Sequence, residues 1–155
     1  MSNDPIKARL QSDLTAAMKA RDEVATSTIR MLRSAITNAE VAGDAAAELS
    51  DDEVTAVLQS EAKKRTESAE VYEQAGRTEL AAKERAELAV IERYLPAAIG
   101  DDELDAIVDE EIANAASSGA EGGRAMGVVI KAVRERVGAS ADGGRIAAVV
   151  RSKLT

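Results

Sequence analysis

Residues 50–96, SDDEVTAVLQSEAKKRTESAEVYEQAGRTELAAKERAELAVIERYLP, decide the fold of this chain. Ser50 is followed three residues later by Glu53, a capping-box pattern that predicts a helix start. Gly76 divides the stretch into two segments with helical spacing of apolar residues, and Pro96 ends the second segment. Because the connection at Gly76 is short, the two predicted helices form an antiparallel hairpin. Thr78 is predicted to cap the second of them.

The distal half of this hairpin carries little apolar volume. Between residues 64 and 87, 11 of the 24 residues are charged, and the large apolar residues are Val71, Tyr72 and Leu80. We therefore expect the base of the hairpin to pack in a core and its tip to project into solvent.

The charged residues of the hairpin are interpreted as exposed. The basic triplet at residues 63–65 has acidic neighbours four residues away, a spacing that favours ion pairs along the helix surface. A binding patch is the alternative for the triplet, and acid–base chemistry is the alternative for the nearby carboxylates. The residues concerned are Glu61, Lys63, Lys64, Arg65, Glu67, Glu84 and Glu87.

Two more helices are predicted before the hairpin. Asp4 as cap and Pro5 in the first helical position start the first helix, and Asp22 caps the second, which stops near Gly43. Their apolar faces are expected to hold Ile6, Leu10, Leu14, Ala17, Met18, Val24, Met31, Leu32, Ala35, Ile36 and Ala39.

The segment from Pro96 to Gly100 interrupts the helical periodicity and is the predicted domain boundary. Three shorter helices follow, over residues 101–117, 123–137 and 142–154. The chain contains 2 Pro, and alanine, the best helix former, supplies nearly half of its apolar residues. The prediction is an all-α protein with a four-helix part over 1–96, including the projecting hairpin, and a three-helix module over 97–155.

The composition excludes several kinds of site. Without Cys or His the chain has no thiolate or imidazole metal ligand, no disulfide and no Ser-His or Cys-His pair. No metal, cofactor or membrane partner is therefore expected, and no apolar run reaches the roughly 20 residues of a membrane span. The N-terminal stretch MSNDPIKARLQSDL lacks a secretory apolar region. We expect a bacterial-type cytoplasmic protein that is not catalytic by itself.

Charge is segregated along the chain. The formal net charge is −8, and residues 101–120 carry seven acidic and no basic residues. Residues 121–155 carry seven basic and three acidic residues. The overall negative charge disfavours a general nucleic-acid binder, but the last 35 residues are a local basic stretch.

The predicted helix over 123–137 carries a basic stripe. At 100° per residue, Arg124, Lys131 and Arg134 point to one side, and the apolar residues face the other. Without Phe or Trp to stack on bases, any RNA contact would be to phosphate and shape. Ordinary solubilising charge is the alternative. The candidate RNA-binding residues are Arg124, Lys131, Arg134, Arg145, Arg151 and Lys153.

The glycine-rich run from Gly122 to Gly127 superficially resembles a phosphate loop. It lacks the Lys-Ser/Thr ending, and no strand precedes it. We interpret it as a helix start at which Gly127 allows a close helix–helix approach. Met31 and Met126 are interpreted as core residues.

Three stretches resemble the family of GatB/YqeY-like proteins, over nearly the whole chain. They are the run from Met18 to Glu40, the run from Leu49 to Pro96, and the C-terminal motifs. The motif residues are Met126, Gly127, Ala141, Asp142 and Gly143. Ala139 and Ser140 replace the Gly-basic pair that is common in this family, and the basic residue that follows the motif is displaced, with Gly144 before Arg145. Two candidate phosphate contacts are thereby lost or moved.

The resemblance implies a two-part helical fold whose C-terminal part is similar to the tail domain of the B subunit of the aspartyl/glutamyl-tRNA amidotransferase. That tail contacts transfer RNA, so the resemblance implies an accessory role in tRNA-dependent amidation. The implied family label is a carbon–nitrogen ligase with glutamine as amide donor. Because the kinase-like catalytic domain is absent, turnover by this chain alone is not expected. The alternative is a protein-interaction adaptor that binds through its acidic N-terminal part or the hairpin tip.

Overall fold

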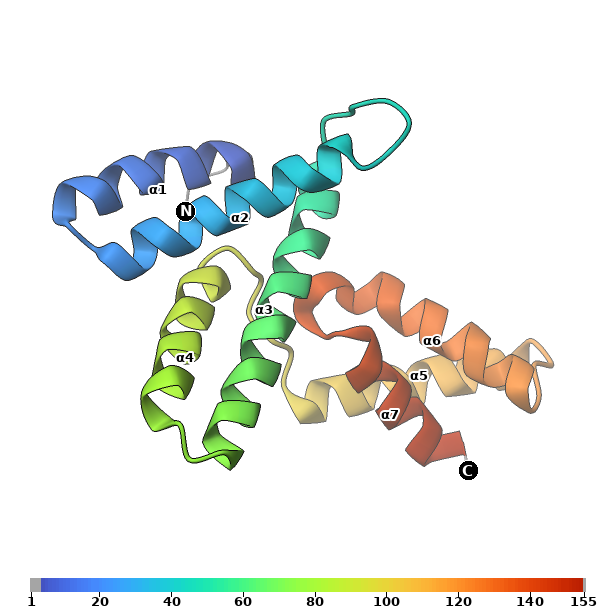
Figure 1. Cartoon of the computed structure of the whole chain (residues 1–155). Helices are drawn as coiled ribbons and strands as arrows, with labels where there is room; N and C mark the ends of the chain where they lie inside the picture. Colours follow the sequence, from blue (N-terminus) through green and yellow to red (C-terminus); the bar gives the residue numbers. More distant parts are fainter. Residues whose placement is uncertain (1–3, 155) are drawn as a thin grey trace. The chain divides into compact units, whose positions relative to one another are not determined.

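A computed structural model describes residues 4–154 of the chain (Figure 1). The chain divides into two compact units, Met1–Leu95 and Pro96–Thr155. The described residues form helices and loops without any strand, which confirms the predicted all-α class. The first three residues of the N-terminal stretch and Thr155 lie outside the described residues.

The first unit is built from two helix pairs. α1 (Ile6–Ala20) lies beside α2 (Glu23–Val41), and α3 (Asp51–Gln74) forms a hairpin with α4 (Thr78–Glu92) (Figure 1). Both pairs contribute to one core because α2 packs on α3 and α4. Its largest fully buried side chains are Leu10, Ile29, Leu32, Leu58 and Ile91.

Local sequence signals place several helix ends correctly. The capping box is confirmed, since the Ser50 hydroxyl accepts from Glu53 N at 3.2 Å and the Glu53 carboxylate accepts from Ser50 N at 3.2 Å. The Asp22 cap is also confirmed, because its carboxylate accepts from Ala25 N at 3.0 Å. Gly76 follows α3 with a φ of +73°, a left-handed conformation that suits glycine.

Other helix ends differ from the prediction by a few residues. Pro5, not Asp4, is the N-cap of α1, and the free Ile6 N–H donates to the Asp51 carboxylate of α3 at 3.2 Å. A tertiary hydrogen bond to Asp51 therefore satisfies the start of α1, where the sequence predicted a local cap at Asp4. Thr78 is the first residue of α4 and not its cap. α4 ends at Glu92, four residues before Pro96.

The buried face of α2 is narrower than its periodicity suggested. It consists of Ala25, Thr28, Ile29, Leu32 and Ile36. Val24 and Met31 on its flanks were predicted as core and are exposed instead, as is Met18 of α1. Leu80, which belongs to the predicted tip of the hairpin, is exposed too. The exposed fractions are 40% for Val24, 42% for Met31, 52% for Met18 and 40% for Leu80.

The hairpin contains a buried ion cluster that the sequence interpretation missed. Arg65 is 6% exposed and Glu87 is 8% exposed, so neither is a solvated surface charge. The Arg65 guanidinium donates to the Glu61 carboxylate one turn earlier, and its Nε donates to Glu87 Oε2 at 3.4 Å across the hairpin. Small Ala69 and Ala81 are buried further toward the tip. The distal hairpin is therefore held by a charge cluster and small residues in place of large apolar side chains.

Glu61 remains a good acceptor in this cluster. Burial acts to raise the pKa of its carboxyl, but hydrogen bonds from Lys64, at 3.0 Å, and from Arg65 outweigh burial. The pKa of Glu61 is consequently held below its usual range. The carboxylate stays charged opposite the Arg65 guanidinium.

Tyr94, directly after α4, is tied to α1. It is 5% exposed, its hydroxyl donates to the Asp13 carboxylate, and the Arg9 guanidinium lies 5.2 Å from the ring centroid. Burial, followed by the hydrogen bond to Asp13, raises the pKa of Tyr94 well above its usual value. A neutral phenol is therefore favoured in the folded protein.

This environment predicts a pH dependence at alkaline pH. Because folding raises the pKa of Tyr94, the stability that this residue contributes is present below its unfolded pKa, about 10. That stability is lost as the pH rises toward the folded pKa. In a Tyr72→Phe variant, where Tyr94 is the one remaining tyrosine, tyrosinate absorbance should appear only well above pH 10, together with a loss of helical circular dichroism. Titration near pH 10 with full helicity would contradict the expected environment.

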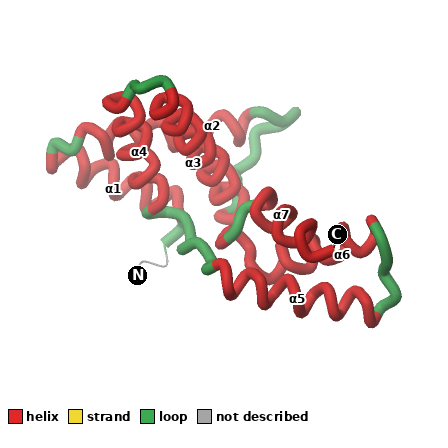
Figure 2. Tube along the Cα trace, turned by 90° about the horizontal axis from the view of Figure 1, so that it is seen from below, coloured by secondary structure: helices red, strands yellow, loops and turns green. Residues whose placement is uncertain are grey.

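The second unit contains α5 (Asp101–Ser117), α6 (Gly123–Val137), the short 3-10 helix η1 (Gly138–Ser140) and α7 (Gly143–Leu154) (Figure 2). α5, α6 and α7 pack on one another around the buried residues Leu104, Val108, Val129, Val133, Ile146 and Val150. Within residues 4–154, every helix falls short of the length and apolar character that crossing a bilayer requires.

Candidate functional site

α6 presents the basic stripe that the sequence predicted. Its buried residues recur every four positions, at Ala125, Val129, Val133 and Val137, so the opposite side of the helix faces solvent. Arg124, Lys131 and Arg134 are exposed on that side. None of these three side chains forms an ion pair with a carboxylate of the described residues. Their charge is therefore available to a ligand.

The other predicted cations of the second unit are engaged within it. Arg145 lies 2.6 Å from an Asp101 carboxylate oxygen, and Lys153 lies 3.0 Å from Asp109. The hydrogen bond to Asp109 raises the pKa of Lys153. Arg151 is exposed and also interacts with other residues of the chain. Arg145 and Lys153 are thus paired with carboxylates of the acidic helix α5, which offset their charge.

Arg136 behaves in the same way. Its Nη1 lies 2.7 Å from Glu110 and 3.1 Å from Glu111, and these hydrogen bonds raise the pKa of its guanidinium. Arg136 therefore faces α5 and not the solvent side of α6. Asp101, Asp109, Glu110 and Glu111 thus pair with cations of α6 and α7, while the solvent side of α6 stays positive.

Two glycines of the C-terminal motifs, Gly127 and Gly143, differ in what surrounds them. A Cβ added at Gly127 would meet no atom within 4 Å outside the backbone of its own helix, and the residue is exposed, so neither α5 nor α7 approaches it closely. The prediction of a close internal helix–helix approach at Gly127 is therefore wrong. At Gly143, a Cβ would lie 2.5 Å from Nη2 of Arg134. The missing side chain at Gly143 leaves the space in which the Arg134 guanidinium lies.

The remaining motif residues shape the connection between α6 and α7. Ala141 is buried, and the Asp142 carboxylate accepts from Arg145 N at 2.8 Å at the start of α7. Met126 packs on the core, as expected. Ser140, which replaces a basic residue of the family pattern, donates to Val137 O at 2.6 Å and accepts from Ile99 N through its carbonyl at 2.8 Å.

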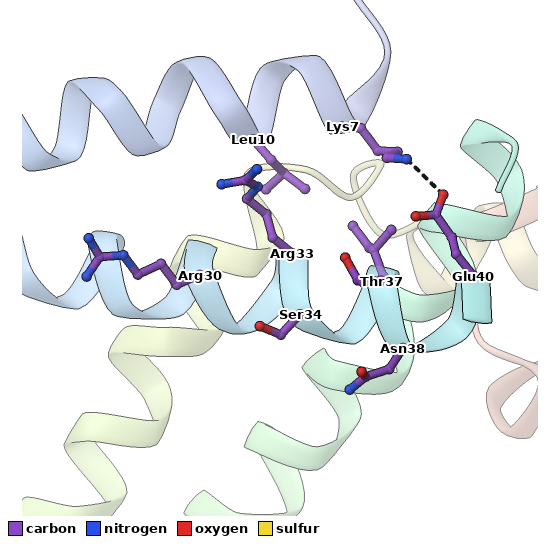
Figure 3. Close-up of a pocket in the computed structure, with 9 residues that line it drawn as sticks. Lys7, Leu10, Arg30, Arg33, Ser34, Thr37, Asn38 and Glu40 are labelled. Atoms are coloured by element: carbon purple, nitrogen blue, oxygen red, sulfur yellow. Dashed lines mark hydrogen bonds and ion pairs between the residues drawn. The ribbon is translucent and has the colours of Figure 1, made fainter. Parts of the chain in front are cut away.

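A second candidate site, which the sequence interpretation missed, lies between α1 and α2 in the first unit (Figure 3). It is an open cavity of about 680 Å³. Arg33 reaches toward Leu10 of α1, and Ser34 and Asn38 project from the other side of α2 (Figure 3). The residues that line it are Lys7, Leu10, Arg30, Arg33, Ser34, Ile36, Thr37, Asn38 and Glu40.

One end of this cavity is closed by an ion pair. Lys7 Nζ lies 2.8 Å from Glu40 Oε2, which also accepts from Leu49 N at 3.1 Å (Figure 3). The hydrogen bond with Lys7 lowers the pKa of Glu40 and raises that of Lys7. These two charges offset each other, so the remaining cations of the cavity are Arg30 and Arg33. Within residues 4–154, no group of three or more acidic side chains is arranged to hold a metal ion.

Two comparisons with known proteins found matches. The sequence pattern of the YqeY-like protein family matches residues 7–154. The chain is also similar to a protein of Pyrenophora tritici-repentis (strain Pt-1C-BFP) named altered inheritance of mitochondria protein 41, mitochondrial. The two are 30% identical over 131 residues, which cover 83% of this chain and 71% of the relative. Because the family pattern spans both helical units, the chain belongs to the YqeY-like protein family.

Proposed function

We propose that this protein is a non-catalytic accessory protein that binds transfer RNA through the solvent face of α6. The observation that carries the proposal is the row formed by Arg124, Lys131 and Arg134, three exposed cations without a carboxylate partner. Phosphate oxygens are the natural acceptors for such a row, because guanidinium and ammonium groups form charge-assisted hydrogen bonds with them. Neutralisation of the neighbouring cations by α5 restricts the contact to this one face.

The shape of this face supports contact with an RNA backbone. Gly127 lies between Arg124 and Lys131 and adds no side chain to the surface, so a sugar–phosphate chain can approach the helix closely. Because Gly143 has no side chain, the Arg134 guanidinium can lie against its α-carbon. With two tyrosines and no other aromatic residue in the chain, recognition would depend on phosphate and shape and not on base stacking.

Such an accessory role fits tRNA-dependent amidation, in which a separate enzyme would carry out the glutamine-dependent step. The chain offers no His or Cys for nucleophilic or metal chemistry, so it would act by holding or delivering the RNA. We place this role in the cytoplasm. The printed name of the fungal relative assigns that protein to mitochondria, and cell fractionation tests the location for this chain.

The binding proposal predicts a salt-dependent interaction. Total transfer RNA titrated with the full chain should bind with a log-affinity that falls linearly with log-salt between about 50 and 200 mM. Three phosphate contacts give a slope of about −2 to −3, at −0.7 to −0.9 for each contact. The net charge of −8 opposes the approach of RNA, so the affinity should be no tighter than about micromolar. Absence of binding at 50 mM salt, or a slope near zero, would remove this function.

A protein-interaction adaptor is the second candidate, and one observation favours it. Val71 and Leu80 lie near the hairpin tip and are 62% and 40% exposed. Apolar side chains in solvent at the end of a hairpin are suited to a small protein contact. Recovery of a protein partner that is lost in a Val71→Ser/Leu80→Ser variant, together with unchanged RNA binding, would separate this candidate from the first.

A further inference from the structure

The cavity between α1 and α2 brings hydrogen-bond donors together with uncompensated positive charge. Between Glu23 and Glu40, α2 carries Arg30 and Arg33 and no acidic residue, although the first unit as a whole is acidic. Arg33 forms no ion pair or hydrogen bond with the described residues. Arg30 has only a 3.8 Å contact with the Met18 sulfur. Both guanidinium groups line the cavity.

The neutral donors of the cavity are also unused. The side chains of Ser34, Thr37 and Asn38 form no hydrogen bond with the described residues and line the same space. By contrast, Thr15 and Ser27 on the same helix pair donate back to carbonyls of their own helices at 3.3 and 3.2 Å. The surface around Arg30 and Arg33 thus presents donors on successive turns of one helix.

A smaller hollow of about 370 Å³ lies on the side of α2 that faces Glu61. Arg30, Ser34 and Asn38 line both this hollow and the larger cavity. These three residues therefore form a ridge with open space on either side. A ligand on the ridge could contact the donors from two directions without displacing any packed side chain.

We propose that the larger cavity, with this ridge at its rim, is a phosphate-binding site, with Arg30 and Arg33 as its principal ligands and Ser34, Thr37 and Asn38 as additional donors around it. A phosphate group offers several anionic oxygens, which matches two planar guanidinium forks and nearby hydroxyl and amide donors. A single carboxylate has too few oxygens to engage both forks and the neutral donors. The carboxylate that lines the larger cavity, Glu40, is turned to Lys7 and Leu49 N, so it does not oppose an anion there. Glu61 lines the smaller hollow, and its carboxylate accepts from Lys64 and Arg65. This inference does not depend on RNA binding by α6.

The phosphate can come from a free nucleotide or from an RNA backbone, and three probes distinguish these sources. The probes are inorganic triphosphate, ATP and an unstructured 12-nucleotide RNA, each titrated into the ¹⁵N-labelled full chain at low salt. Amide shift changes should concentrate at residues 30–38 and saturate. Saturation by triphosphate and ATP identifies a free phosphate ligand, and saturation by the RNA alone identifies a phosphodiester.

An Arg30→Gln/Arg33→Gln variant should weaken whichever probe binds by at least tenfold, because both charged donors are lost. An Arg77→Gln/Arg93→Gln variant is the matched control, since it removes two exposed arginines of the same unit and should retain affinity. A Lys131→Gln/Arg134→Gln variant should also leave the shifts at residues 30–38 unchanged, whether or not α6 binds RNA. Equal affinity at residues 30–38 in wild type and Arg30→Gln/Arg33→Gln for all three probes, or no saturating shifts at residues 30–38 with any probe, overturns the proposal. Shifts on α6 with the RNA probe report on the α6 face and do not bear on this site.

Discussion

Replacing Arg65 by methionine should destabilise the first unit by about 3–5 kcal/mol. The Arg65 side chain is 7% exposed, and the two carboxylates that it serves, Glu61 and Glu87, are 14% and 10% exposed. Methionine fills a similar volume but offers no donor. Glu87 would then be left buried without its guanidinium partner, and Glu61 would keep only Lys64. The cost comes from this uncompensated charge and not from a cavity.

Tyrosine fluorescence during urea unfolding measures the effect in the first unit, because Tyr72 and Tyr94 are the two aromatic residues of the chain and both lie in it. Lys64→Met is the matched control. The Lys64 side chain is 63% exposed and bonds the same Glu61, so this change should cost no more than about 0.5 kcal/mol.

The Arg65→Met/Glu87→Leu double variant separates the two physical causes. An apolar pair in place of a buried ion pair is often neutral or stabilising, so it should recover at least half of the loss. A cost below about 1 kcal/mol for Arg65→Met alone would mean that water already solvates the cluster. No recovery in the double variant would mean that packing, and not charge, is the cause.

Helical periodicity in the sequence predicts that Arg65 and Glu87 are buried, although their charge suggests that they are exposed. Arg65 lies seven residues after Leu58 and four before Ala69, so helical periodicity alone places it on the buried face. Glu87 likewise precedes Ile91 by four residues. Each charge violates the apolar pattern, and only the other helix of the hairpin supplies the partner that makes burial tolerable. Reading one helix at a time therefore misses the pair.

Helix starts illustrate which features are local enough to predict. The Ser50 and Asp22 caps depend on residues within three positions, and the sequence predicts both correctly. The donor at Ile6 is satisfied by Asp51, 45 residues away, and no local rule anticipates that contact. The limit lies in sequence separation and not in the strength of the interaction.

In each candidate site, the features that lie on one helix can be predicted from the sequence, and those that need a second helix cannot. Spacing along α6 is sufficient to predict which side carries Arg124, Lys131 and Arg134. It does not predict that Arg145 and Lys153 pair with Asp101 and Asp109, because those contacts require the packing of α5 on α7. In the first unit, the acid-free run between Glu23 and Glu40 was a visible signal for the ridge of α2. The wall of the cavity, however, comes from α1.

Charge reversal on α6, Lys131→Glu/Arg134→Glu, should weaken transfer RNA binding by about 100-fold at low salt. Each lost charge-assisted contact contributes at least about 1.4 kcal/mol, which is tenfold in affinity, so two contacts give two orders of magnitude. Both side chains are exposed, so the helical circular dichroism and the unfolding midpoint should change little. The log-salt slope should fall in magnitude by close to two contacts.

A Lys63→Glu/Lys83→Glu variant controls for the change in net charge. Both lysines are exposed in the first unit, and their reversal alters the total charge by the same amount as the reversal on α6. If RNA binding responds only to the summed field of an acidic protein, the two variants should lose affinity equally. If phosphates contact α6 directly, the α6 variant should lose affinity about 100-fold and the control less than about threefold, because charges that make no direct contact with the RNA are screened by salt. Equal losses, or unchanged affinity in the α6 variant, would remove the α6 face from RNA binding.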